Sequence, residues 1–174
     1  MDLPIRIYGD PVLREVSRPV EGITDEIRKL ADDMIHAMRD GDGIGLAAPQ
    51  VGRLVRLIVL EGDVFGDGET PRVFLNPEIT HSSRARTTYE EGCLSIPGIR
   101  ADVERPEEIV VRYRTLDGEE REEEAVDLPA RVLQHEIDHL NGKLFIDHLG
   151  AARRNLLRKK LRELQRQASR PSNA

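Results

Sequence analysis

His135, Glu136 and His139 are residue types, at a spacing, from which a metal-dependent hydrolytic site can be built. On a helix, positions four apart share one face, so both imidazoles can reach a single divalent metal ion. Glu136 would then be free to take a proton from a water molecule at that metal. The alternative is a solvated helix face that carries two unrelated histidines. The pattern favours a metal site and leaves the reaction open.

The helix that must carry this motif has its own boundary signals. Asp127 and Pro129 predict its beginning, and Asn141 and Gly142 predict its end. Apolar residues fall on most sides of the segment, which indicates a central and mostly buried helix. Because buried histidines need polar partners, a shared metal ion is the simplest explanation for them.

A catalytic metal site usually has three protein ligands and one open position, so two histidines leave it one ligand short. Cys93, the only cysteine of the chain, is one candidate for the third ligand. A carboxylate or another histidine are the others. A lone cysteine is most often a small buried apolar residue, so Cys93 by itself is a weak signal.

Length and composition predict a soluble protein of one domain. The 174 residues can form a substantial core without disulfides, and a single cysteine allows none within the chain. We find no signal-peptide pattern and no apolar run of membrane-spanning length, so we expect a cytoplasmic location. The net charge is -6, yet residues 151–174 carry eight Lys or Arg against one Glu. This basic end predicts either a solvated helix face or contact with a polyanion.

The order of the predicted elements indicates an α+β fold. The first half predicts an arm at 3–13 and then an amphipathic helix that has Thr24 as its N-cap and stops at the Asp40–Gly43 cluster. A loop of small uncharged residues suited to a peptide backbone follows at 43–52, then a buried strand at 54–60 and a surface loop at 61–72. The second half predicts short strands at 73–79 and 87–89, with His81 in a turn between them. It also predicts a hairpin of strands 108–116 and 119–126 around Asp117 and Gly118, and a terminal helix at about 150–168.

We therefore predict several short, mainly antiparallel strands around a central buried helix that carries HEIDH, with an N-terminal amphipathic helix and a C-terminal helix. The second hairpin strand is acidic and should lie at a sheet edge or face solvent. The terminal helix should turn Leu156, Leu157, Leu161 and Leu164 toward the body of the protein.

Three segments resemble, in their order and separation, the signature motifs of the bacterial peptide deformylases. They are GIGLAAPQ at 43–50, EGCLS at 91–95 and HEIDH at 135–139. The resemblance extends from GDPVLR at 9–14 to KLFIDHL at 143–149. It implies a single catalytic domain over residues 1–174 that removes the formyl group from the N-terminal formylmethionine of new polypeptides and releases formate.

The resemblance also implies roles for individual residues. Cys93, His135 and His139 would bind one divalent metal ion, most often Fe(II), which zinc, nickel or cobalt can replace. Glu136 would transfer protons, and the Gln50 side chain and the Leu94 backbone N–H would stabilise the negative oxygen. The positions that would contact substrate are Ile44, Gly45, Tyr89, Gly92, Arg100, Leu128, Arg131 and Val132.

Two arginines carry further expectations. We expect the stem of Arg131 to contact substrate while its charged head reaches water. Arg105 and Asp138 could form a pair behind the metal ligands, or they could form an ordinary surface salt bridge. His148 is expected to be structural.

The resemblance implies formylmethionyl nascent peptides as partners, and we hypothesise that the basic helix contacts the ribosome. We expect no binding to a membrane and no sequence-specific binding to nucleic acid. Two alternatives remain open. A zinc peptidase would need a third ligand after HEIDH, where His148 is the only histidine. A noncatalytic ribosome-associated metal protein would have a fourth protein ligand or a dispensable Glu136.

Overall fold

The computed structural model describes residues 2–170 and confirms the α+β class. Its helices are α1 (Asp25–Asp40), α2 (Asp127–Leu140) and α3 (Ala151–Ser169). Its strands are β1 (Gly45–Ala47), β2 (Leu57–Leu60), β3 (Arg72–Ser82), β4 (Arg86–Cys93), β5 (Ile96–Pro106), β6 (Glu108–Arg114) and β7 (Glu120–Val126). Short 3-10 helices at Pro11–Arg14, Ala48–Val51, Gly62–Val64 and Phe145–His148 connect them.

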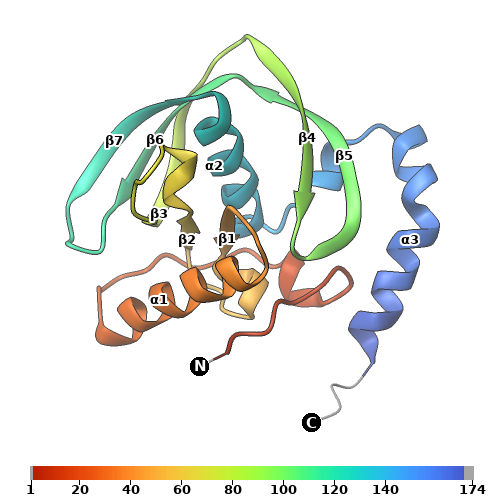
Figure 1. Ribbon diagram of the computed structural model, residues 1–174, viewed down its shortest axis with the longest axis horizontal. Coiled ribbons are helices and arrows are strands. Elements are labelled where there is room, and N and C mark those ends of the chain that lie inside the picture. Colours follow the sequence, from red (N-terminus) through yellow and green to blue (C-terminus); the bar gives the residue numbers. More distant parts are fainter. Residues whose placement is uncertain (1, 171–174) are drawn as a thin grey trace.

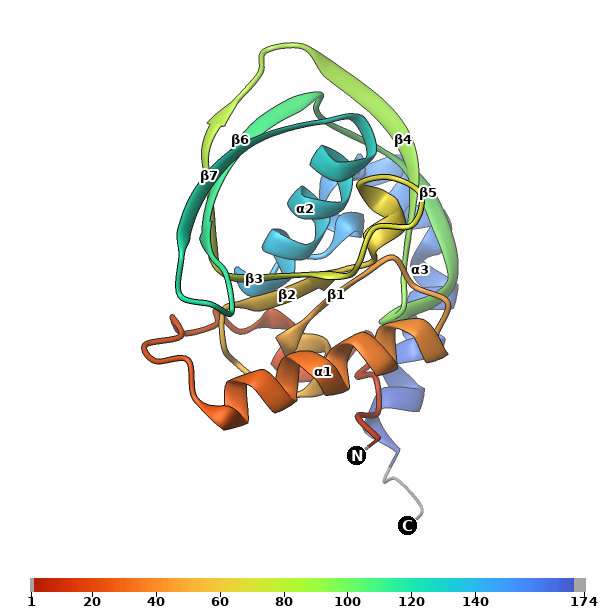
Figure 2. The same cartoon turned by 60° about the vertical axis from the view of Figure 1, so that its left-hand side comes forward.

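Five strands form an antiparallel sheet in the order β1-β2-β3-β6-β7, and β4 and β5 form a separate two-stranded sheet. β2 is buried on both faces because its side chains alternate between two apolar clusters. Leu57 and Val59 pack with α1, whereas Ile58 and Leu60 pack with α2. The two helices therefore cover opposite faces of the sheet, which curls around α2 (Figure 1, Figure 2).

α2 is the central buried helix that the sequence predicts. It begins at Asp127, Asn141 is its C-cap, and ten of its residues are buried. Leu133, Ile137 and Leu140 pack against the five-stranded sheet. Its polar residues are consequently left to face β4 and β5, where they make the contacts described below.

α1 also follows its sequence signals. The hydroxyl of Thr24 caps the helix by accepting a hydrogen bond from the backbone N–H of Ile27 at 3.3 Å. Leu30, Met34 and Met38 form the buried face that packs on the sheet. The exposed side carries charged residues, so the amphipathic pattern is satisfied.

Strand structure is more extensive than predicted. The short segment expected at 87–89 lies in the first half of β4, and β5 was not predicted at all. His81 lies in β3 and not in a turn. β3 continues past Pro77 because Asn76 adopts a positive φ of 51° and the register shifts between Leu75 and Glu78, which absorbs the irregularity.

The segment predicted as a loop at 43–52 is partly regular. Gly45 to Ala47 form β1, which pairs with β2 and stands at one edge of the sheet, and a 3-10 helix follows. The acidic strand β7 occupies the opposite edge, as predicted. The outer edge of β1 is thus open to a further strand.

α3 packs against the outside of β5 through one narrow stripe of its surface (Figure 1). Leu161 and Leu164 are buried there and Leu157 is partly buried. The prediction for Leu156 was wrong, because this side chain is one position off the stripe and 82% exposed. Within residues 2–170, no helix combines the length and the apolar composition needed to cross a membrane.

Candidate metal centre and substrate pocket

Cys93, at the end of β4, faces the two histidines of α2. The potential ligand atoms of Cys93, His135 and His139 all lie within 4.8 Å of one another. The Cys93 Sγ is 3.4 Å from His139 Nε2. A β-strand and a helix far apart in the sequence therefore bring together the three predicted ligands as one possible metal site.

The protonation preferences of these groups fit a bound cation. Burial, together with the neighbouring His135, holds the pKa of His139 well below its usual value, so this imidazole is neutral, as a metal ligand must be. Burial also opposes charge on His135, yet its contacts with Cys93 and Glu91 raise its pKa well above the usual value. The anionic surroundings of His135 thus favour a positive charge at this point. A metal ion would supply that charge in place of the proton.

Glu136 lies beside the cluster and is buried. Burial raises the pKa of its carboxyl group to about 7. Its Oε1 is 4.0 Å from His135 Nε2, and its Oε2 has no hydrogen-bond partner among the described residues. A buried carboxylate oxygen without a partner is costly, and such groups are concentrated at functional sites.

Gly45 of β1 packs directly against this carboxylate. A Cβ atom at Gly45 would lie 2.8 Å from Glu136 Oε1 and 2.9 Å from Val132 Cγ1. Any side chain here would push into Glu136 and Val132 of α2, which are both buried. Glycine is therefore required for β1 to approach the helix closely.

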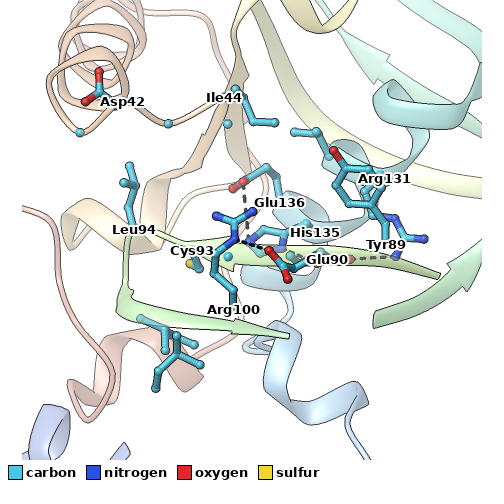
Figure 3. A pocket seen from close by; sticks show the side chains of 18 of the residues that line it. Asp42, Ile44, Tyr89, Glu90, Cys93, Leu94, Arg100, Arg131, His135 and Glu136 are labelled. Atoms are coloured by element: carbon cyan, nitrogen blue, oxygen red, sulfur yellow. Dashed lines mark hydrogen bonds and ion pairs between the residues drawn. The ribbon is translucent and has the colours of Figure 1, made fainter. Parts of the chain in front are cut away.

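An open pocket of about 470 Å³ lies over this cluster (Figure 3). Its lining includes every residue for which the sequence predicted a catalytic, metal or substrate role, with the exception of His139, which lies beneath. Ile44 and Tyr89 are about half exposed at the pocket, at 48% and 53%. Arg100 lies across it and pairs with Glu90 at 2.9 Å.

The Gln50 side chain is held in one orientation. Its Oε1 accepts a hydrogen bond from the Ala47 backbone N–H at 2.9 Å. Its Nε2 donates to Cys93 Sγ at 3.4 Å and to Ser95 Oγ at 3.1 Å. The amide donors of Gln50 consequently point at the cluster, and Leu94 lines the pocket beside them.

Glu91 is a residue of this site for which no role was predicted. It accepts hydrogen bonds from His135 Nδ1 at 2.7 Å and from Arg105 at 2.7 and 3.0 Å. The pKa of Glu91 is well below its usual range, because these contacts outweigh the effect of burial. The bond to Nδ1 leaves Nε2 of His135 directed at the cluster. A carboxylate behind a histidine is a common arrangement at metal sites.

The prediction for Arg131 was wrong in one respect. It does line the pocket, but its charged head does not reach water, and the residue is only 6% exposed. The guanidinium donates to Glu91 at 2.9 Å and to the backbone carbonyls of Val103 and Thr87, each at 2.8 Å. Its partners are carboxylate and carbonyl groups that the sequence alone did not place beside it.

Arg105 and Asp138 form a partly buried pair behind the histidines and not an ordinary surface salt bridge. Arg105 is 3% exposed and donates to Asp138 Oδ2 at 2.8 Å while also binding Glu91. His148 Nε2 lies 2.8 Å from the same oxygen of Asp138. His148 therefore takes part in the ionic network behind the cluster.

A cysteine and two imidazoles beside a buried carboxyl group, in an open pocket, are typical of metal-dependent hydrolases. Comparison with known proteins narrows this class. The family model for polypeptide deformylase matches residues 2–155, so the chain belongs to that family, whose members remove N-formyl groups from nascent peptides.

The match extends over most of the chain. The peptide deformylase of Mesorhizobium japonicum is 51% identical over 161 residues, which cover 92% of each chain. That of Brucella suis is 51% identical over 164 residues, or 94% of each chain. The crystal structure of a peptide deformylase from Legionella pneumophila matches with a TM-score of 0.87 and 41% identity, over 98% of this chain and all of the other.

Proposed function

We propose that this chain, as a single catalytic domain in the cytoplasm, hydrolyses the N-formyl group of formylmethionyl nascent peptides. The observation that carries the proposal is the cluster of Cys93, His135 and His139 beside the unpartnered carboxylate of Glu136. The alternative of a zinc peptidase loses support because Cys93, upstream of HEIDH, offers a third ligand atom beside the two histidines. His148 is turned to Asp138 instead.

Formate release from formyl-Met-Ala-Ser tests this function directly. The protein should be purified without oxygen and loaded separately with iron, nickel or zinc. Each form is compared with a Glu136→Ala variant loaded with the same metal. Formate at the level of the variant with all of these metals would contradict the proposal.

Cys93, His135 and His139 would hold the ion, and we propose Fe(II) in the cell, with zinc, nickel or cobalt able to replace it. Thiolate and imidazole ligands suit all of these ions. When bound, the ion supplies Lewis acidity that polarises water and the formyl carbonyl group. The open pocket in front of the cluster leaves room for both.

Glu136 is proposed to carry the proton through the reaction. It takes a proton from the attacking water and returns it to the departing nitrogen of the methionine residue. A pKa of about 7 suits both steps near neutral pH, because the group then exchanges protons readily in either direction. Its free Oε2 is the atom available for this exchange.

Gln50 and the backbone N–H of Leu94 are proposed to stabilise the negative oxygen that develops on the formyl group. The Gln50 Nε2 donates one hydrogen to Ser95 Oγ at 3.1 Å, and its other contact, to Cys93 Sγ, is long at 3.4 Å. The hydrogen that points to Cys93 can therefore turn to the oxygen. Donors that are already oriented cost little reorganisation during the reaction.

The peptide is proposed to bind as an added strand along β1. β1 is at the edge of its sheet, and Ile44 and Gly45 line the pocket from that edge. Gly92 would pair with the peptide from the side of β4. The methionine side chain would enter the space lined by Tyr89, Leu128, Arg131 and Val132, and Arg100 would contact a later residue of the peptide.

Replacing Cys93 with serine should weaken metal retention by about tenfold or more, because a serine hydroxyl stays protonated and is a poor ligand for these ions. Metal content after dialysis of zinc-loaded protein measures the effect. The unfolding temperature of the metal-free variant should match that of the wild type. Unchanged metal content would show that the third ligand is a different residue.

We also propose that α3 contacts the ribosome through a row of arginines. Arg154, Arg158 and Arg162 line a shallow cavity beside Tyr8, and none of the three forms a salt bridge to a described residue. Arginines four positions apart repel one another on a helix, and an arginine in the first turn opposes the helix dipole. These costs are relieved when a polyanion such as the phosphate backbone of RNA binds.

Charge reversal of this row should lower co-sedimentation with ribosomes at low salt. Arg154, Arg158 and Arg162 are changed together to glutamate, which leaves Leu161 and Leu164 packed. A control with the same change in net charge replaces Arg18, Arg28 and Arg84, which are exposed and lie outside α3. Equal pelleting of the two variants would leave α3 with a structural role only.

A further inference from the structure

The carboxylate of Glu91 is fully occupied by hydrogen bonds. Its Oε1 accepts from His135 Nδ1 at 2.7 Å and from Arg105 Nη2 at 3.0 Å. Its Oε2 accepts from Arg105 Nε at 2.7 Å and from Arg131 Nη1 at 2.9 Å. A carboxylate has about four acceptor sites, so Glu91 cannot turn without losing one of these bonds.

Arg131 and His135 reach the same carboxylate from the same helix. They stand one turn apart on α2 and therefore share a face. The guanidinium is fixed by three further bonds, to the carbonyl of Val103 on β5 and to the carbonyl and hydroxyl of Thr87 on β4. It is thus held rigidly between the helix and the β4–β5 sheet, and it holds Glu91 in turn.

The same arginine borders the substrate pocket. Its Cζ lies 5.9 Å from the centre of the Tyr89 ring, and Figure 3 shows the two side chains together at the end of the pocket beyond His135 and Glu136. Arg131 therefore has two roles. It forms a wall of the space proposed for the methionine side chain, and it donates a hydrogen bond to Glu91, the carboxylate behind His135.

We infer that Arg131 is a positioning residue that acts on the metal ligand His135 through Glu91. Its positive charge draws electron density from the carboxylate and limits how strongly Glu91 pulls on the Nδ1 proton of His135. This limits the donor strength of His135 Nε2 and keeps the bound ion a strong Lewis acid. The inference rests on the proposed function, in which His135 is a ligand of the catalytic ion.

The test uses protein loaded with Co(II), whose visible absorption reports its ligands directly. Arg131→Met keeps a side chain of similar length and removes the charge and the hydrogen bonds, and Arg131→Lys keeps the charge. The control is Arg86→Met on β4, an exposed arginine paired with Glu104 outside the pocket. Spectra, kcat and KM are measured for each.

We expect Arg131→Met to shift the Co(II) bands and to lower kcat by about 10- to 100-fold, with a smaller change in KM. Arg131→Lys should fall between this variant and the wild type, and Arg86→Met should match the wild type. If Arg131→Met does not fold, the test rests on Arg131→Lys, whose Co(II) bands should differ from those of the wild type.

Two results would overturn the inference. Unchanged bands with an altered KM and an altered preference among methionine, norleucine and phenylalanine would make Arg131 a pocket wall only. Unchanged bands with only a lower unfolding temperature would make it a structural clamp. Because the spectra need no substrate, failure of formate release in the wild type would count against the proposed function and would not affect this comparison.

Discussion

Replacing Glu136 with glutamine is expected to lower formate release by a factor of about 10² to 10⁴. The substitution keeps the size of the side chain and removes the group that exchanges the proton. Metal content should stay the same, because the three ligand residues are untouched. The measurement is the rate of formate release at equal metal occupancy. A rate close to that of the wild type would mean that another group carries the proton.

The same substitution should make the metal-free protein more stable at neutral pH. Burial raises the folded-state pKa of Glu136 from 4.5 to about 7, whereas the unfolded chain keeps the ordinary value. The folded state therefore loses stability relative to the unfolded state as the pH rises from about 4.5 to 7. The full loss is roughly 3 kcal/mol, since each pKa unit corresponds to about 1.4 kcal/mol. Glutamine cannot ionise and escapes this loss.

Urea unfolding of the metal-free proteins at several pH values measures this effect. The stability difference between Glu136→Gln and the wild type should grow between about pH 4.5 and 7. Glu90→Gln is a matched control, because Glu90 lines the same pocket but is exposed and pairs with Arg100 at the surface. That variant should change stability by less than about 1 kcal/mol. A difference for Glu136→Gln that is the same at every pH would contradict the burial argument.

The sequence predicts α2 well because its signals are local. Asp127 and Asn141 mark its ends, and the apolar residues between them repeat with the helical period. The same segment fixes the positions of His135, Glu136 and His139 relative to one another. For these reasons the sequence alone predicts the central helix and the relative positions of its two histidines and its glutamate.

β5 and all of β4 except 87–89 escaped prediction because much of the length of both strands faces solvent. Residues 86–90 of β4 are all exposed, so no alternation of buried and exposed side chains marks them as a strand. The two strands are held together by backbone hydrogen bonds to each other, and the pattern of apolar residues in the sequence does not reveal this pairing. The role of Glu91 was missed with them. Once β4 is known, Glu91 and Cys93 are two positions apart on one face of a strand, which is the signal that would have found it.

The head of Arg131 could not be placed from the sequence for a related reason. Its charged partner, Glu91, stands 40 positions earlier in the chain, and the fold alone brings them together. An arginine without a known partner is correctly expected to reach water. Four charged groups, Glu91, Arg105, Arg131 and Asp138, instead neutralise one another behind the metal ligands. The buried charges of this site therefore form a unit that spacing alone could not predict.

Replacing Arg105 with methionine is expected to lower the free energy of unfolding by about 3 to 5 kcal/mol. Arg105 is 3% exposed and binds two carboxylates, Glu91 at 2.7 Å and Asp138 at 2.8 Å. Without Arg105, the buried carboxylate of Glu91 and the partly buried carboxylate of Asp138 each lose a positively charged partner. Denaturant unfolding of the metal-free protein measures the loss. Arg86→Met is the matched control, because its exposed pair with Glu104 should be worth less than about 1 kcal/mol.

The pH dependence separates this ionic loss from a loss of packing. Burial alone would raise the pKa of Glu91, but hydrogen bonds from His135 and Arg105 outweigh it and hold the pKa well below the usual 4.5. A lowered folded-state pKa gives stability that is present above about pH 4.5 and is lost as the pH falls below it. Part of that stability is already missing in Arg105→Met, so the gap between variant and wild type should narrow in acid. A gap that is as wide at about pH 3 as at pH 7 would assign the effect to the lost volume of the side chain and not to its charge.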